Sequence, residues 1–292
     1  MLDHSDVENR RRELKETINI LKTRGYNKTA VQISNLLPIL DAETPPSDLT
    51  ERFDSLFLAF EEDFVSNLPL IPEYGRKCLR EIREIIYEKA WKKNNATIYS
   101  SLLTEICPLL ESLNDVRDVE NAISDLIRRS DITTEIGREG IAYLYLFLYQ
   151  IYCEGIFDNL VRLLFAIHQL LQNRKIVLKD IDEKEFSDII KTLENDGVQK
   201  WSFLRNWDEK RRVRNAIAHA RFSYDPAEGY HFENFNVQKY RDTRDKKKSC
   251  FWEREMQFEE FRKLALELDY PLQAFYFTFM LLRACELLKV RK

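Results

Sequence analysis

Apolar residues recur at intervals of three and four along most of the chain, which is the period of an amphipathic helix. Proline-containing segments at 41–48 and 67–74 interrupt the pattern and are expected to be loops. In the N-terminal part the pattern predicts helices over about residues 5–24, 28–40, 49–64, 75–92, 97–112 and 115–129. Successive helices of this kind favour a bundle or a short stack of helical hairpins. Residues 1–130 contain no combination of side chains that indicates catalysis, so we expect a packing or partner-binding domain there.

Segment 141–171, IAYLYLFLYQIYCEGIFDNLVRLLFAIHQLL, is the most apolar part of the chain. A membrane span needs about 20 predominantly apolar residues, but Glu154, Asp158 and Arg162 interrupt this segment. We therefore expect a central core helix and no membrane partner. Glu154 and Asp158 are four positions apart and share a helix face. Because a carboxylate is costly to bury without a partner, we expect arginines of residues 211–221 to face them; the alternative is an exposed acidic strip.

After residue 219 the hydrophobic period changes from 3.6 towards 2. Residues 220–236 predict two strands joined by a turn that contains Pro226 and Gly229. Residues 249–257 predict a third strand, which completes a small β-meander. The charged segment 241–248, RDTRDKKK, is expected to be a solvated loop, with an RNA-gripping loop as the alternative.

The other predicted helices complete a bundle around the apolar segment. A helix is expected over 180–194 and another over 258–268, and the aromatic run 274–288 is expected to pack against segment 141–171. The predicted fold class is therefore mainly α. We expect two domains: an N-terminal helical domain of unknown role over 1–130, and a C-terminal four-helix bundle over 131–292 with the β-meander inserted into it.

Composition limits the classes of function. The chain has 292 residues, of which 44% are hydrophobic and 32% charged, with 7 glycines and 8 prolines, and this composition favours a helical protein with a substantial core. Its net charge of −4 excludes a generic nucleic-acid coat, so any RNA contact must be local. Five scattered cysteines without a CxxC pair predict free thiols in a reducing compartment, and the polar start predicts no secretory signal. We expect a cytoplasmic protein without a metal or cofactor, because no P-loop, dinucleotide fingerprint or HExxH occurs.

Residues 211–224, RRVRNAIAHARFSY, combine residue types that favour chemistry. As a helix, the segment buries one face, formed by Val213, Ala216, Ile217 and Ala220. Arg212, Asn215 and His219 share a neighbouring face. Arg214 lies about 140° around the helix from His219, so one helix alone does not bring the two together.

A histidine can transfer protons near neutral pH, and a fixed guanidinium can stabilise phosphate oxygens. Together they suit cleavage of RNA through its own 2′-hydroxyl, without a metal. Asn215 lies four residues before His219, so it can orient the imidazole or the phosphate. The structural alternative is that the arginines are solvated and that His219 caps the end of the helix.

Arg214 to His219, Arg-Asn-Ala-Ile-Ala-His, resembles the R-N-x-x-x-H signature of the HEPN superfamily, and the resemblance covers the C-terminal half of the chain. It implies a homodimer in which arginines and histidines of two protomers form one metal-independent ribonuclease site. Arg214 would then bind phosphate, Asn215 would be the polar residue that follows it, and His219 would be catalytic. Arg211, Arg212 and Arg221 would contact RNA, and Glu154 or Asp158 would support the motif helix.

The resemblance further implies a toxin or antiviral-defence setting, with an antitoxin or a regulatory protein as a partner. Two other interpretations stay open. One is a catalytically inactive HEPN-like module that binds RNA, a nucleotide or a partner protein. The other is a purely structural helical adaptor.

Overall fold

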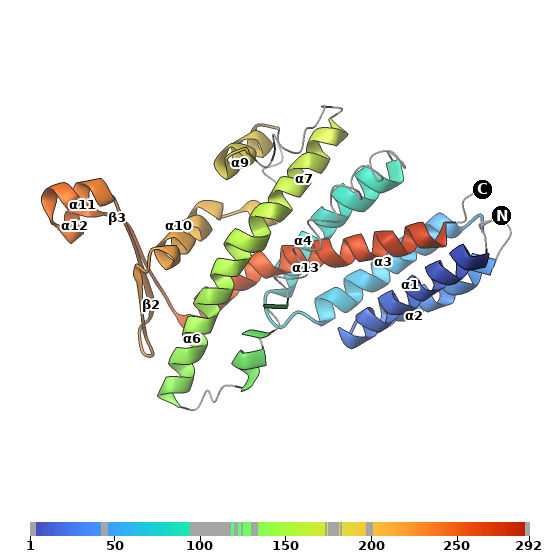
Figure 1. The fold of residues 1–292 in the computed structure, drawn as a ribbon, viewed down its shortest axis with the longest axis horizontal. Helices are drawn as coiled ribbons and strands as arrows, with labels where there is room; N and C mark the ends of the chain where they lie inside the picture. Colours follow the sequence, from blue (N-terminus) through green and yellow to red (C-terminus); the bar gives the residue numbers. More distant parts are fainter. Residues whose placement is uncertain are drawn as a thin grey trace. The chain divides into compact units, whose positions relative to one another are not determined.

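The computed structural model describes residues 4–41, 46–93, 118–119, 122–123, 125–129, 134–172, 174, 181, 183–196 and 201–289. These residues are mostly helical and include a three-stranded antiparallel sheet, which confirms the predicted mainly α class with a small β insertion (Figure 1). The predicted helix over 97–112 and part of that over 115–129 lie outside the described residues. The chain divides into two compact units, Met1–Lys93 with Gln273–Lys292, and Asn94–Leu272.

The N-terminal part of the first unit consists of helices near the predicted bounds. Gly25, with a φ of 82°, separates the first helix from the second, where a left-handed residue favours glycine. The elements are α1 (His4–Thr23), α2 (Asn27–Leu36), the 3₁₀-helix η1 (Leu37–Asp41), α3 (Leu49–Ser66), α4 (Pro72–Arg83) and the π-helix η2 (Glu84–Lys93).

Aromatic side chains form the core of the first unit. The ring centroid of Tyr26 lies 5.5 Å from that of Phe60 and 4.4 Å from that of Phe277, which belongs to α13 (Phe258–Leu288). The aromatic run 274–288 therefore belongs with the N-terminal helices, not to the unit that contains segment 141–171. One boundary between the units falls inside α13, between Leu272 and Gln273.

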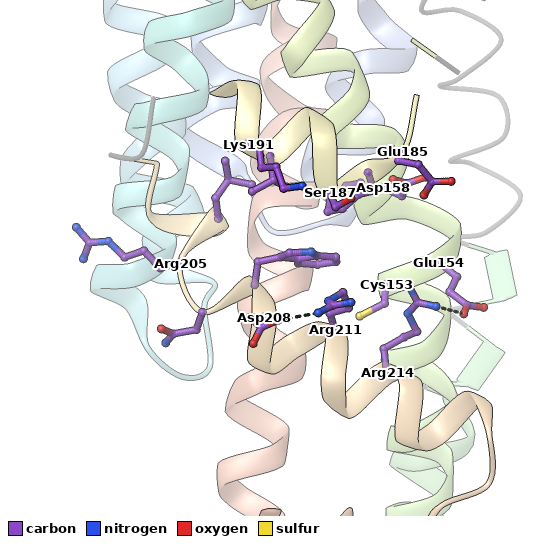
Figure 2. Close-up of a pocket in the computed structure, with 15 residues that line it drawn as sticks. Cys153, Glu154, Asp158, Glu185, Ser187, Lys191, Arg205, Asp208, Arg211 and Arg214 are labelled. Carbon is purple, nitrogen blue, oxygen red and sulfur yellow. Dashed lines mark hydrogen bonds and ion pairs between the residues drawn. The ribbon is translucent and has the colours of Figure 1, made fainter. Parts of the chain in front are cut away.

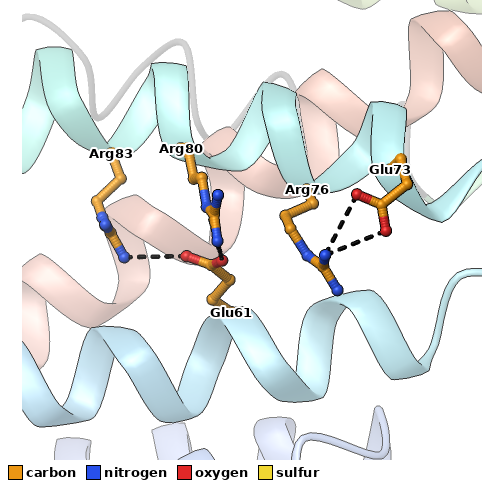
Figure 3. A network of polar contacts seen from close by, with 5 residues as sticks. All are labelled: Glu61, Glu73, Arg76, Arg80 and Arg83. Carbon is orange, nitrogen blue, oxygen red and sulfur yellow. Dashed lines mark hydrogen bonds and ion pairs between the residues drawn. The ribbon is translucent and has the colours of Figure 1, made fainter.

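A half-buried ion cluster joins α3 to α4. Glu61 of α3 accepts hydrogen bonds from Arg80 (Nε, 2.7 Å) and Arg83 (Nη1, 3.2 Å), both on α4 (Figure 3). Its two carboxylate oxygens are thus shared between two guanidinium groups, an arrangement that strengthens hydrogen bonds to charged groups. The cluster fixes the two helices side by side.

In the second unit, α6 (Glu135–Gln150), the π-helix η3 (Ile151–Phe157) and α7 (Asp158–Leu171) follow one another without a break. Among the described residues, only Gly137–Leu171 is long and apolar enough to cross a membrane by those criteria alone. Half of its most apolar window is buried in the fold (50%), and the core helix of a soluble protein meets the same criteria.

Smaller helices and the sheet complete the second unit. The strand order is β1-β2-β3 and both pairings are antiparallel, which confirms the predicted β-meander. Segment 241–248 was expected to be a loop, but most of it is helical. The elements are α9 (Phe186–Asn195), the 3₁₀-helix η4 (Ser202–Leu204), α10 (Trp207–Ala218), β1 (Phe222–Asp225), β2 (Gly229–Phe235), α11 (Val237–Thr243), α12 (Lys246–Ser249) and β3 (Cys250–Met256).

Candidate functional site

The motif residues lie in the last turns of α10, which ends in a Schellman cap. The backbone N–H of Arg221 donates to Ala216 O (2.7 Å) and that of Ala220 to Ile217 O (2.9 Å). Ala220 has a φ of 51°, a left-handed position that usually favours glycine. His219 is the C-cap residue and its side chain is exposed. A position at the C-terminal end of the helix is what the alternative of a structural, helix-capping His219 predicted.

A buried face anchors α10 to the rest of its unit. Lys210, Val213 and Ala216 are fully buried, whereas Ala220, predicted on this face, is exposed because the helix ends before it. The Nζ of Lys210 lies 3.0 Å from Glu267 of α13, and the Lys210 carbonyl accepts a hydrogen bond from the hydroxyl of Tyr149. The sequence did not predict Lys210 on the buried face, because a lysine is expected to keep its charged end in water.

The sheet also contacts α10, through a hydrogen bond from β2. The buried Asn234 of β2 donates from Nδ2 to the carbonyl of Arg212 at 2.8 Å. The side chain of Arg212 turns back to Asp208 on its own helix, at 2.8 Å. A predicted RNA-contacting residue thus has a structural role through its backbone and a local ion pair through its side chain.

A cavity of about 830 Å³ lies beside α10 and contains Arg214 and Arg211 in its lining. Glu154 accepts a hydrogen bond from Arg214 Nη1 at 3.2 Å, and Asp208 accepts one from Arg211 Nη2 at 2.9 Å (Figure 2). Basic and acidic side chains are balanced in the lining: Lys191, Arg205, Arg211 and Arg214 against Glu154, Asp158, Glu185 and Asp208. An anion that enters must therefore compete with the carboxylates already present.

The carboxylate that contacts Arg214 comes from the π-helical turn η3. Such turns interrupt α-helices mostly as single features, frequently at functional sites. The expected pairing between segment 141–171 and the motif helix occurs at Glu154. Asp158 lines the same cavity but pairs with Arg162 of its own helix at 2.9 Å, because an oppositely charged side chain four residues away is the nearest partner.

The thiol of Cys153 forms part of the cavity wall, next to Glu154. Burial raises the pKa of Cys153 to about 12, although the Tyr149 hydroxyl and the charge of Arg214 lower it in part. A thiol with this pKa is protonated at neutral pH and is a poor nucleophile. The Cys153 thiol therefore contributes to the shape of the cavity wall and not to its reactivity.

Trp207, the first residue of α10, lines the cavity and packs between two other aromatic rings. Its ring is stacked on that of Phe157, with 5.0 Å between the centroids, and is tilted against that of Phe186, at 4.6 Å. Neither Trp207 nor Arg205 was predicted as a site residue. The signal available in the sequence was that Trp207 lies one turn before Arg211 on the motif helix and that Arg205 lies just before this helix begins.

The predicted catalytic histidine lies outside the cavity. His219 and Asn215 do not line it, and their side chains make no hydrogen bond to any other described residue. By contrast, His168 and His231 lie within 3.3 Å of carboxylates. His219 is therefore the exposed imidazole without a carboxylate partner among the histidines whose side chains are described.

Arg221 has yet another environment. Its guanidinium lies 5.3 Å from the centre of the Phe235 ring, and Nη1 donates to the Phe235 carbonyl.

Of the predicted site residues, the structure thus brings Arg211, Arg214, Glu154 and Asp158 together at one cavity. It leaves Arg212, Asn215, His219 and Arg221 outside it.

No family model, curated protein or solved structure matches the chain. The chemistry of the site is therefore inferred from its own residues and from the R-N-x-x-x-H resemblance.

Proposed function

We propose that the protein is a metal-independent endoribonuclease that acts as a homodimer. The observation that carries the proposal is the presentation of Arg214 and His219 on one helix in two different surroundings: a cavity, and the exposed helix end. A second copy related by a twofold axis would offer its own Arg214 and His219 at the same interface. The R-N-x-x-x-H pattern is consistent with such a composite site.

The reaction would proceed by internal attack. An imidazole of His219 accepts the proton of the 2′-hydroxyl, whose oxygen then attacks the adjacent phosphorus. Arg214 stabilises the negative charge that develops on the phosphate oxygens. The 5′-oxygen leaves with a proton donated by the imidazolium of the second protomer's His219, so the products carry a 2′,3′-cyclic phosphate and a 5′-hydroxyl. To reach the phosphate, Arg214 must exchange Glu154 for the substrate.

The proposal is tested by incubating purified protein with single-stranded RNA in EDTA. We expect cleavage by the wild type and loss of cleavage in both His219→Ala and Arg214→Ala. His168→Gln is the matched control, because His168 belongs to the same unit and pairs with Asp196 at 3.2 Å, away from the motif. Equal activity in the wild type and His219→Ala would overturn the proposal.

A second candidate is a module that binds a phosphate-bearing ligand without cleaving it. It is favoured by the cavity itself, which has Arg205, Arg211, Arg214 and Trp207 in its lining but no histidine. A nucleotide or a short RNA could place phosphate beside the guanidinium groups. Binding that needs Arg211 and Arg214, without cleavage in EDTA, would favour this candidate.

We further propose a toxin or antiviral-defence role in the cytoplasm, as the motif resemblance implies. In that setting the unrestrained enzyme would degrade cellular RNA, and an antitoxin or a regulatory protein would control it. Induced expression should arrest growth with the wild type and should be tolerated with His219→Ala. Growth arrest by both proteins would argue against a toxic ribonuclease activity.

A further inference from the structure

The segment between β2 and β3 is strongly basic in an acidic protein. Residues 237–249, which contain α11 and α12, carry six basic and two acidic side chains, a net charge of +4, whereas the whole chain has −4. Figure 1 shows the two helices together at one end of the β2–β3 hairpin. We refer to residues 237–249 as the basic arm.

Most positive charges of the basic arm are not used within the fold. Lys246 pairs with Glu233 at 2.6 Å and Lys248 with Asp245 at 3.4 Å. The other four basic side chains are exposed and have no ion-pair or hydrogen-bond partner among the described residues: Lys239, Arg241, Arg244 and Lys247. A cluster of solvated cations attracts a polyanion, because binding releases the counterions that surround it.

Aromatic rings are exposed on the same part of the molecule. Tyr240 of α11 is 41% exposed, and Phe251, which lies two residues after the end of α12, is 63% exposed. Exposed rings beside unpaired cations suit single-stranded nucleic acid, since unstacked bases can pack on the rings while the cations contact phosphates.

Phe235 connects the basic arm to the end of the motif helix. Lys246 of α12 and Arg221 each lie 5.3 Å from the centre of the Phe235 ring. Arg221 follows His219 by two residues, so cationic and aromatic groups continue from the exposed imidazole to the arm. The contacts all belong to one compact unit.

We propose that the basic arm binds single-stranded RNA and guides it along Phe235 towards His219. This inference rests on the proposed ribonuclease function, and it assigns the RNA path to a surface outside the cavity of Arg214. An anionic membrane surface is disfavoured as the partner, because α11 and α12 have only 7 and 4 residues and offer little apolar face to insert.

The test measures RNA binding without cleavage. Fluorescence anisotropy with a labelled single-stranded RNA is recorded at several salt concentrations, on full-length protein carrying His219→Ala. In the arm variant Lys239, Arg241, Arg244 and Lys247 are all changed to Gln. In the control variant Arg12, Lys15, Lys22 and Arg24 of the first unit are changed to Gln; these exposed side chains also have no partner among the described residues.

We expect the arm variant to lose at least about tenfold in affinity and to show a shallower salt dependence, by about 0.7 in slope for each phosphate that the arm no longer neutralises. The control should bind like its parent. Phe251→Ser should weaken binding by about fivefold or more, because a base can no longer stack on the ring. Equal reductions of affinity in arm and control variants would overturn the inference, and so would an unchanged RNA affinity of the arm variant. In the second case, reduced binding of the arm variant to phosphatidylserine vesicles would identify a membrane surface as the partner.

The result is separable from the proposed function. If RNA binding depends on the arm but the wild type does not cleave RNA in EDTA, the inference about the basic arm stands and the proposed ribonuclease activity is wrong. If the wild type cleaves RNA and the arm variant binds RNA normally, the ribonuclease proposal stands and the inference about the arm is wrong.

Discussion

Arg214 and Glu154 form an ion pair in the wall of the candidate cavity, although 60 residues separate them in the chain. The contact joins the motif helix to the π-helical turn, and both side chains are partly exposed, 33% for Arg214 and 47% for Glu154. The guanidinium that is proposed to bind phosphate is therefore held in place by a group that RNA must displace.

Glu154→Gln should strengthen RNA binding. Loss of the carboxylate removes the competitor for Arg214, and the gain should reach about fivefold, since exposed ion pairs contribute up to ~1 kcal/mol. Anisotropy titration in the His219→Ala background measures it. Asp158→Asn is the matched control, because Asp158 lines the cavity but pairs with Arg162. Weaker binding after Glu154→Gln would indicate that orienting Arg214 matters more than competition for it.

Lys210→Ala should destabilise the protein by about 2–3 kcal/mol, because removing a fully buried side chain leaves a cavity. The lysine is fully buried, and its removal leaves Glu267 without this cation and the carbonyl of Arg205 without this donor. Lys210→Met should cost less because it keeps most of the volume. Urea unfolding measures both, and a destabilisation below about 0.5 kcal/mol for Ala would contradict the burial argument.

Ala220→Gly should stabilise the protein by about 1 kcal/mol, because the left-handed φ of 51° costs alanine energy that glycine avoids. Ala218→Gly, two residues earlier in the regular helix, is the control and should destabilise it by about 0.5–1 kcal/mol. Thermal melts of the two variants should shift in opposite directions. Shifts of the same sign would show that the Schellman cap at Ala220 does not form.

His219→Ala should lower the cleavage rate by about 10²- to 10⁴-fold, the usual contribution of general acid–base catalysis. Stability should change little, because the side chain is exposed and without a partner among the described residues. End-labelled products should carry a 2′,3′-cyclic phosphate, and DNA should resist cleavage because it lacks the 2′-hydroxyl. A 3′-hydroxyl product, or activity that requires Mg²⁺, would exclude the mechanism; a strong loss of stability would point to a structural histidine.

A composite site also predicts complementation between inactive variants. Mixing His219→Ala with Arg214→Ala, after mild unfolding and refolding, should restore part of the activity through heterodimers that retain one intact group of each kind. Sedimentation at micromolar concentration should show a dimer. A monomer in the presence and absence of RNA, with no recovery on mixing, would rule out the twofold arrangement.

The periodic pattern predicted the helices well where one face is apolar and the other polar. The β-meander was also predictable, because the alternation changes where β1 begins and Gly229, whose φ is 90°, begins β2 directly after the turn. The run 274–288 could not be placed by pattern, since a helix that is apolar around most of its circumference does not specify its partner. Tyr26 and Phe60 are those partners in the structure.

Within the candidate site, sequence spacing correctly separated Arg214 from His219 and suggested a carboxylate partner in segment 141–171. It did not reveal which carboxylate, because Asp158 meets Arg162 locally while Glu154 reaches Arg214. The helices of the basic arm were missed despite a signal. Asn236 and Asp245 cap them, each accepting a backbone N–H through its side chain.

The π-helical turn Ile151–Phe157 has a consequence for how this chain tolerates insertions and deletions. Hydrogen bonds from i to i+5 enclose one more residue than those of an α-helix. Deleting a single residue there would remove the extra residue and restore a regular helix, and the turns on either side would keep their relative phase. Glu154 and Asp158 would then lie three or four positions apart and would still share a face. A one-residue deletion inside this turn should therefore be tolerated better than the same deletion within α7, where it would rotate the residues on one side by about 100° relative to the other.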